Sequence, residues 1–261
     1  MIPRLLGDLP NPPKKLFHLG NFSEKIFENC VGIVGSRKMT DYGKRVIERI
    51  IPQLVFEKKT IVSGFMYGVD QYAHQICVDN GGRTIAVLGW GIDIPLYDYD
   101  KKLAKQIIDK DGLILSEWKD QKGTLWTFPM RNRIVAGLCQ ELIVVEASEN
   151  SGSLITARIA NKLKRKVWAV PGPITSKTSA GTNTLIASKQ AEMWLPNVNK
   201  SINQPSNSPI ISILENESLT ADELARKLGR SVAEVGVDLS MLLLNGAVIE
   251  RGSKYYLNDA N

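Results

Sequence analysis

The sequence predicts an α/β protein in which a mostly parallel sheet is followed by a smaller C-terminal domain. Short β-branched, apolar segments alternate with amphipathic helices up to about residue 196. A polar stretch rich in Asn, Ser and Pro, residues 197–208, then shows no hydrophobic periodicity. We therefore expect an arm at residues 1–29, the α/β domain at 30–196, a linker at 197–208 and a second domain at 209–261.

Seven strands are predicted, and most are almost uniformly apolar, as strands buried on both faces of a parallel sheet are. They are Val31–Gly35, Thr60–Gly64, Thr84–Gly89, Leu113–Trp118, Leu142–Ala147, Lys166–Val170 and Met193–Leu195. The segments Asp41–Lys58, Asp70–Asp79 and Leu154–Lys164 have the apolar period of helices, and Pro52 predicts a kink or break in the first. Strand–helix alternation of this length predicts an extended, doubly wound, Rossmann-like sheet.

The pattern after the linker predicts a winged-helix domain. A short helix is expected around residues 210–214, and capping boxes at Thr220–Glu223 and Ser231–Glu234 each open another. The last of these helices is expected to run to about Asn245. A hairpin with its turn at residues 251–253 then forms the wing.

The composition excludes several classes of protein. With 43% apolar and 23% charged residues among 261, the chain is neither collagen-like nor wholly disordered. No apolar run approaches the roughly 18 residues that a membrane span needs, and the N-terminus lacks the apolar stretch of a signal peptide. The three cysteines are far apart and form no CxxC, so we expect no disulfide scaffold or zinc module, and a cytoplasmic location.

The charge is unevenly divided between the two predicted domains. The 33 Lys and Arg against 27 Asp and Glu give a net charge of +6. Residues 209–261 hold five basic and eight acidic residues, a net of −3, so the preceding 208 residues carry +9. If the partner is a polyanion, the α/β domain is expected to bind it.

Small, hydroxyl-rich loops follow five of the predicted strands, and in a parallel sheet these loops share one edge. They are Gly35–Lys38, Ser63–Asp70, Gly89–Gly91, Glu149–Ser153, and a long loop from Pro171–Pro173 to Gly181–Asn183. Glycine lets backbone N–H groups approach phosphate oxygens, and a following helix points its positive end at them. One such loop alone favours a simple tight turn, whereas all five together favour a phosphate-binding edge.

The spacing of the glycines disfavours NAD and ATP as the phosphate ligand. The first loop has Gly32-x-x-Gly35 in place of GxGxxG, and Arg45 follows Gly43-Lys44 where a P-loop needs Ser or Thr. Arg37 with Lys38 instead suits a phosphodiester backbone. We therefore expect no nucleotide cofactor.

The segment from Phe128 to Arg133 combines two arginines, an asparagine and an aromatic ring beside Trp126. Phosphate neutralisation with base stacking is the chemistry of single-strand binding. Two alternatives stay open: Arg131 and Arg133 as structural salt-bridge partners at a helix N-terminus, and Phe128 as a core residue.

The sequence supports an enzyme less well than a single-strand-binding protein. His74 lies four residues after Asp70 on a predicted helix, which favours a structural hydrogen bond. Ser63 has no GxSxG context, and nothing in their spacing makes Glu117 and Glu146 a carboxylate pair. No His/Cys cluster has the spacing of a metal site.

Ordered blocks along the α/β region resemble the DNA-processing protein A family (DprA, also called Smf). They are Val31-Gly-Ile-Val-Gly-Ser-Arg37, Ser63-Gly64 with Gly68-Val-Asp70 and Ala73-His74, Gly81–Gly89, Leu115-Ser-Glu117, Phe128-Pro-Met-Arg-Asn-Arg-Ile-Val-Ala-Gly137, Val144–Ala147, Ser151–Ala157, Ala169-Val-Pro-Gly172 and Gly181-Thr-Asn183. The C-terminal module also resembles an accessory domain of that family.

The resemblance implies a cytoplasmic, non-catalytic mediator of natural transformation. Such proteins bind and protect single-stranded DNA, form homodimers and load the recombinase RecA. The DNA and phosphate contacts predicted by the loops and the resemblance together are Gly35, Ser36, Arg37, Lys38, Gly64, Lys122, Phe128, Arg131, Asn132, Arg133, Ser151, Gly152, Ser153, Lys177, Gly181, Thr182 and Asn183.

The chain departs from the family at Tyr67, where an arginine is usual, at Trp90, where smaller residues are, and at Trp126-Thr127, where many members have Gly-His. An alternative function is a phosphoribohydrolase-like enzyme on a related sheet, although the PGGxGTxxE signature of that family is absent. A winged-helix transcription factor is disfavoured because groove binders need a basic face. We expect the C-terminal module to contact protein instead.

Overall fold

A computed structural model describes residues 2–195, 208–244 and 247–258. The chain divides into two compact units, Met1–Trp194 and Leu195–Asn261. Most of the predicted linker, residues 197–207, lies outside the described residues, as does the helix end expected at Asn245. No helix within the described ranges is long and apolar enough to cross a bilayer.

The first unit is built on one eight-stranded sheet. Its strands are β1 (Phe17–Leu19), β2 (Cys30–Val34), β3 (Thr60–Ser63), β4 (Thr84–Val87), β5 (Leu113–Ser116), β6 (Glu141–Val144), β7 (Lys166–Ala169) and β8 (Glu192–Met193). They lie in the order β1-β5-β4-β3-β2-β6-β7-β8, and all neighbours are parallel except β1 and β5. The predicted doubly wound sheet is confirmed, and its order reverses between β2 and β6.

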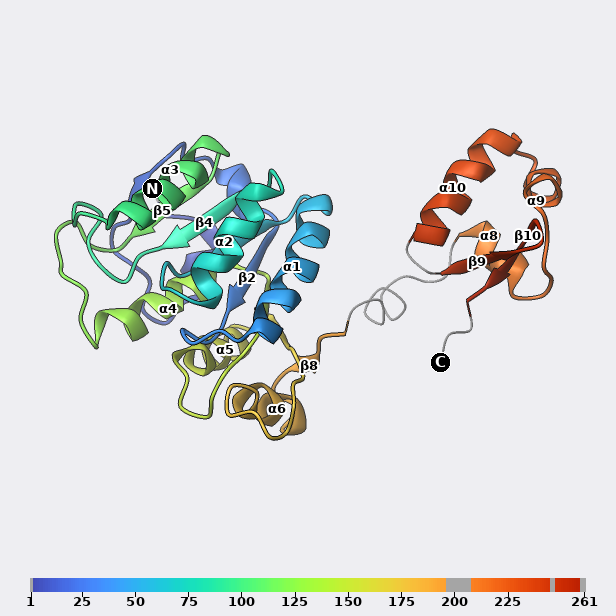
Figure 1. Ribbon diagram of the computed structural model, residues 1–261. Coiled ribbons are helices and arrows are strands. Elements are labelled where there is room, and N and C mark those ends of the chain that lie inside the picture. Colours follow the sequence, from blue (N-terminus) through green and yellow to red (C-terminus); the bar gives the residue numbers. More distant parts are fainter. Residues whose placement is uncertain (1, 196–207, 245–246, 259–261) are drawn as a thin grey trace. The chain divides into compact units, whose positions relative to one another are not determined.

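Helices cover both faces of this sheet (Figure 1). The helices α1 (Asp41–Phe56), α2 (Val69–Asp79) and α3 (Asp98–Asp109) pack on one face, and α4 (Thr127–Leu138) and α5 (Gly152–Lys162) on the other. Side-chain alternation along β2 serves both layers, because Val31 and Ile33 pack with α1 while Cys30 and Val34 pack beneath α4 and α5. The short α6 (Ala180–Ala187) precedes β8.

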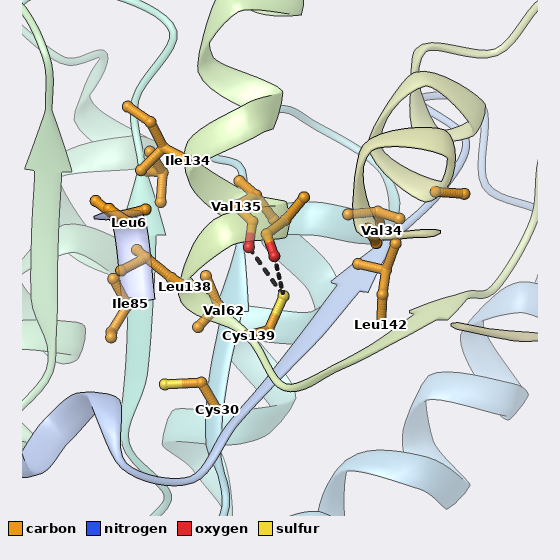
Figure 2. Close-up of a cluster of buried hydrophobic side chains, with 14 of the residues drawn as sticks. Leu6, Cys30, Val34, Val62, Ile85, Ile134, Val135, Leu138, Cys139 and Leu142 are labelled. Atoms are coloured by element: carbon orange, nitrogen blue, oxygen red, sulfur yellow. Dashed lines mark hydrogen bonds between the residues drawn. The ribbon is translucent and has the colours of Figure 1, made fainter. Parts of the chain in front are cut away.

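The segment predicted as an N-terminal arm packs within this unit. Its short helices η1 (Arg4–Asp8) and η2 (Glu24–Phe27) flank β1, which pairs with β5. Leu6 lies in the core beside Ile134 and Leu138 of α4 (Figure 2). The same figure shows the Cys139 thiol donating to the carbonyl oxygen of Val135, at 2.9 Å, in the last turn of α4. This packing fixes the C-terminal end of α4 in the core.

Of the kink or break predicted at Pro52, the break is wrong, since α1 runs through this residue as one helix of 16 residues. Ile47, Ile50 and Ile51 are almost fully buried in the turns that lead up to Pro52, and their packing holds the helix together despite the missing hydrogen bond. Thr40 caps its N-terminus by accepting from the Gly43 amide at 3.3 Å.

The second unit contains α8 (Pro209–Leu214), α9 (Ala221–Leu228), α10 (Val232–Leu244) and the hairpin β9 (Val248–Arg251)–β10 (Lys254–Leu257). Both capping boxes form: Glu223 accepts from the Thr220 amide at 2.8 Å, and Glu234 from the Ser231 amide at 3.0 Å. A small core includes Leu224 and Val248. The assignment of these elements as a winged helix stays a prediction.

Candidate functional site

A cleft of about 540 Å³ opens at the carboxyl ends of β2, β3 and β6. It therefore lies at the reversal of strand order, where open parallel sheets bind ligands. Twelve of the predicted contact residues line it: Gly35, Ser36, Arg37, Lys38, Gly64, Phe128, Arg131, Asn132, Ser151, Gly152, Ser153 and Lys177. These residues come from five separate segments of the chain, which the fold brings together.

The loop after β2 presents positive charge to this cleft. Arg37 and Lys38 are exposed, and the Ser36 Oγ accepts from the Lys38 amide at 3.0 Å. Within the described residues, the amides of Ser36 and Arg37 have no acceptor, so they remain open to an anion. Gly68, at φ +86°, packs against the Ser36 carbonyl so closely that a Cβ would overlap with it.

Arg37 lies between two aromatic rings. Its guanidinium carbon is 5.1 Å from the centroid of the Phe128 ring and 6.0 Å from that of Tyr67. Trp90 supports Phe128 from behind with an edge contact at 6.2 Å. Because Phe128 is only half-buried and lines the cleft, it is not simply a core residue. The two cation–π contacts hold the arginine at the cleft.

The helical period of α4 decides which of its side chains reach the cleft. Phe128, Arg131, Asn132 and Val135 all line it, at the i, i+3, i+4 and i+7 spacing of one helix face. Arg133 lies off that face and does not line the cleft. The expectation that Arg131 and Arg133 share one binding edge is therefore wrong.

Arg133 instead forms a structural ion pair. Its Nη1 and Nη2 donate to the two carboxylate oxygens of Glu117 at 2.8 and 2.6 Å, and its Nε donates to the Asn11 carbonyl at 2.9 Å. Both charged side chains are largely buried. The salt-bridge alternative left open by the sequence is thus the correct one for Arg133.

Arg131 lies at the floor of the cleft and is 3% exposed. Its Nη1 donates to the Val87 carbonyl, its Nη2 lies 4.0 Å from Asp70 Oδ2, and its Nε has no partner among the described residues. Burial lowers the pKa of Arg131 and raises the pKa of Asp70. A Cβ at Gly64 would overlap with both side chains, so only glycine leaves room for this pair. Asp70 offsets the charge of Arg131, so the positive charge available to a ligand comes from the exposed cations of the cleft.

The N-terminus of α5 adds a second source of positive potential. Ser151 is its N-cap: the Oγ accepts from the Ser153 amide at 3.4 Å and lies 2.8 Å from the Ser153 hydroxyl. Asn132 Nδ2 donates to the Gly152 carbonyl at 3.2 Å, which ties α4 to this turn. The positive end of the helix dipole therefore faces the same cleft as Arg37.

Glu146 holds two of the loops around the cleft in place. Its buried carboxylate accepts from the amide and the hydroxyl of Thr40, with the amide at 2.9 Å, and from the Thr178 hydroxyl at 3.4 Å. Thr178 adjoins the exposed Lys177, which lines the cleft. Glu117 and Glu146 thus have separate structural partners and do not form a catalytic pair.

The remaining predicted contacts lie outside the cleft. Lys122 is exposed on the loop before α4. The Gly181 amide donates to the Ala147 carbonyl at 2.8 Å, and the Asn183 side chain bonds both the amide and the carbonyl of Gly172 at 3.1 and 3.0 Å. The hydroxyl of buried Thr182 donates to the Ser179 carbonyl. The structure does not bring residues 181–183 together with the other predicted phosphate contacts, because these groups already brace the loop before α6.

His74 is a structural residue. It is fully buried, with Nε2 2.6 Å from the Gly64 carbonyl and Nδ1 2.6 Å from the Thr84 hydroxyl. Burial lowers its pKa to about 4. The Ser63 hydroxyl donates to the Ile33 carbonyl at 2.5 Å and is not free to act as a nucleophile. Across residues 2–195, 208–244 and 247–258, no group of three His, Cys, Asp or Glu side chains forms a metal site.

Among the cleft-lining residues that the sequence did not identify as contacts are Met66, Tyr67, Leu125 and Thr178. Tyr67 and Leu125 are 58% and 94% exposed, which is unusual for large apolar side chains. In the sequence, Tyr67 was noted only because it replaces the arginine usual in the family. Its aromatic ring was the signal that could have identified it as a binding residue.

The fold and the cleft define a Rossmann-like protein with a cation-lined cleft at the switch point of its sheet. Residues 1–204 match the family model of DNA recombination-mediator protein A, and the chain belongs to this family. It is 42% identical over 191 residues to protein Smf of Synechocystis, covering 70% of this chain, and 41% identical over 182 residues to DprA of Streptococcus pneumoniae, covering 69%. The chain spans only 47% and 64% of the lengths of these two relatives.

The solved structures similar to this chain include two DprA proteins. DprA from S. pneumoniae has a TM-score of 0.69 at 36% identity, covering 78% of this chain and 71% of that one. DprA from Helicobacter pylori, whose single-stranded DNA binding mode has been described structurally, has a TM-score of 0.68 at 32% identity, covering 78% and 92%.

Proposed function

We propose that this chain binds single-stranded DNA in the cleft and acts, without a catalytic step, as a recombination mediator. The observation that carries the proposal is the convergence of three exposed cations, Arg37, Lys38 and Lys177, with the N-terminus of α5 and the rings of Tyr67 and Phe128. Cations with a helix N-terminus attract phosphates, and aromatic faces accept unpaired bases. The single-strand binding mode of the H. pylori relative supports the same ligand.

Fluorescence anisotropy of the full chain with labelled oligonucleotides tests this proposal. Binding to a single strand should weaken as salt rises, with log affinity falling against log salt at a slope of about −0.7 for each phosphate contacted. A duplex of the same sequence should bind more weakly, because its bases are covered by their neighbours. Absence of single-strand binding at low salt, or affinity independent of salt, would contradict the proposal.

We further propose that the protein works in the cytoplasm as a homodimer that protects incoming DNA and loads RecA during natural transformation. All three cysteines are buried free thiols, which supports a reducing compartment. Light scattering on the purified chain measures its oligomeric state, and a monomer at every concentration would contradict the dimer. RecA loading is tested by whether the chain accelerates RecA assembly on single strands coated with a single-strand-binding protein.

A further inference from the structure

We infer that Tyr67 is a base-stacking residue, which holds one nucleobase of the bound strand against its ring while Arg37 binds the adjoining phosphate. The inference rests on the proposed function and names the part of the nucleotide that this side of the cleft recognises. Tyr67 lines the cleft, yet 58% of its surface is exposed. A ring that the fold leaves uncovered beside cations is available for the flat, apolar face of a base.

The chain holds this ring at the cleft through the short loop between β3 and α2. Gly64 at the start of the loop packs against Arg131, and Gly68 at its end packs against the Ser36 carbonyl. The Val69 amide donates to the same carbonyl at 3.1 Å, and the Gln71 amide donates to the Met66 carbonyl at 3.1 Å. Both ends of the loop are therefore fixed, so the ring loses little freedom when a ligand stacks on it.

The surroundings of the ring match a nucleotide better than a simple anion. The guanidinium of Arg37 lies between the rings of Tyr67 and Phe128, so charge and aromatic surface alternate across a few ångströms. The Tyr67 hydroxyl makes no hydrogen bond to any described residue, so its ring is not needed as a structural donor. Leu125, 94% exposed, adds further apolar surface to the cleft lining. Inorganic phosphate would leave all this apolar surface in water, whereas a single strand would cover it.

An oligonucleotide without bases separates stacking from phosphate binding. The full chain and its Tyr67→Ala and Tyr67→Phe variants are titrated with labelled oligothymidylate and with an abasic strand of the same length. We expect Tyr67→Ala to weaken oligothymidylate binding by about 5- to 150-fold, the range of one base–aromatic stack. Its affinity for the abasic strand should stay within about twofold, because the phosphate contacts remain. Tyr67→Phe keeps the ring and should bind both strands as the unmodified chain does.

Each alternative outcome has a distinct meaning. If Tyr67→Ala weakens both strands equally, Tyr67 only positions Arg37 and the inference is overturned. If it weakens neither, no base stacks there, and the inference is again overturned. If the unmodified chain binds neither strand at low salt, the proposed function fails together with the inference. A thermal melt of each variant checks that the exposed substitution leaves the fold intact.

Discussion

Replacing Arg37 by alanine should weaken DNA binding strongly while leaving the fold stable. The side chain is exposed, and among the described residues it makes cation–π contacts to Tyr67 and Phe128, each worth about 0.5–1 kcal/mol at exposed sites. Stability should therefore fall by no more than about 1–2 kcal/mol. A hydrogen bond to a charged phosphate is worth about 1.5–3 kcal/mol, so the affinity for a single strand should fall by about 10- to 150-fold.

Anisotropy titrations at several salt concentrations provide the assay. Loss of one phosphate contact should also reduce the magnitude of the salt slope by about 0.7. Arg49→Ala is the matched control, since Arg49 is an exposed arginine of α1 that does not line the cleft. Equal effects of the two substitutions, or an unchanged slope for Arg37→Ala, would refute the assignment of Arg37 to a phosphate.

Three further predictions concern the buried polar groups. Arg133→Ala should lower the free energy of unfolding by about 3 kcal/mol, because it leaves the Glu117 carboxylate largely buried and unpaired. Urea denaturation measures this free energy, and a loss below about 1 kcal/mol would contradict the prediction. Glu146→Gln should cost about 1–3 kcal/mol in the same assay and weaken single-strand binding, since an amide has one acceptor oxygen for the two Thr40 donors. His74 should make stability depend on pH: with its pKa lowered to about 4, the unfolded chain binds the extra proton, so stability is retained above about pH 6.5 and falls by about 3 kcal/mol as the pH drops to 4. In urea denaturation, His74→Gln should lose this fall in stability between pH 6.5 and 4. A pH profile of stability unchanged from that of the unmodified chain would contradict the role given to His74.

The sheet was predictable because its strands are buried on both faces and so have an apolar pattern that no surface strand shares. The exact ends of the strands were not predictable, because the residues just beyond the last hydrogen-bonded pair are still apolar. Leu88, for example, is 2% exposed but follows the end of β4 at Val87. The edge strand Phe17–Leu19 was missed because its three residues have no alternation to detect and are defined only by pairing with β5.

The candidate site was predictable as a set of loops but not as a set of side-chain directions. Strand order brings the loops after β2, β3 and β6 together, and this placement does not depend on the directions of their side chains. Arg131 and Arg133 look equivalent in the sequence, yet two residues apart on a helix they point to different surroundings. Gly181 and Asn183 belong to a motif rich in small residues, but their polar groups are consumed by tertiary hydrogen bonds that only the fold reveals.

Amide hydrogen exchange of the full chain, with and without a short single-stranded oligonucleotide, tests the location of the interface most directly. We predict slower exchange at residues 35–38 and 151–153 when the oligonucleotide is bound, because these amides line the cleft. Residues 181–183 and the Arg133 side of α4 should be unaffected. Protection confined to residues 181–183, or to residues 209–258, would contradict the account.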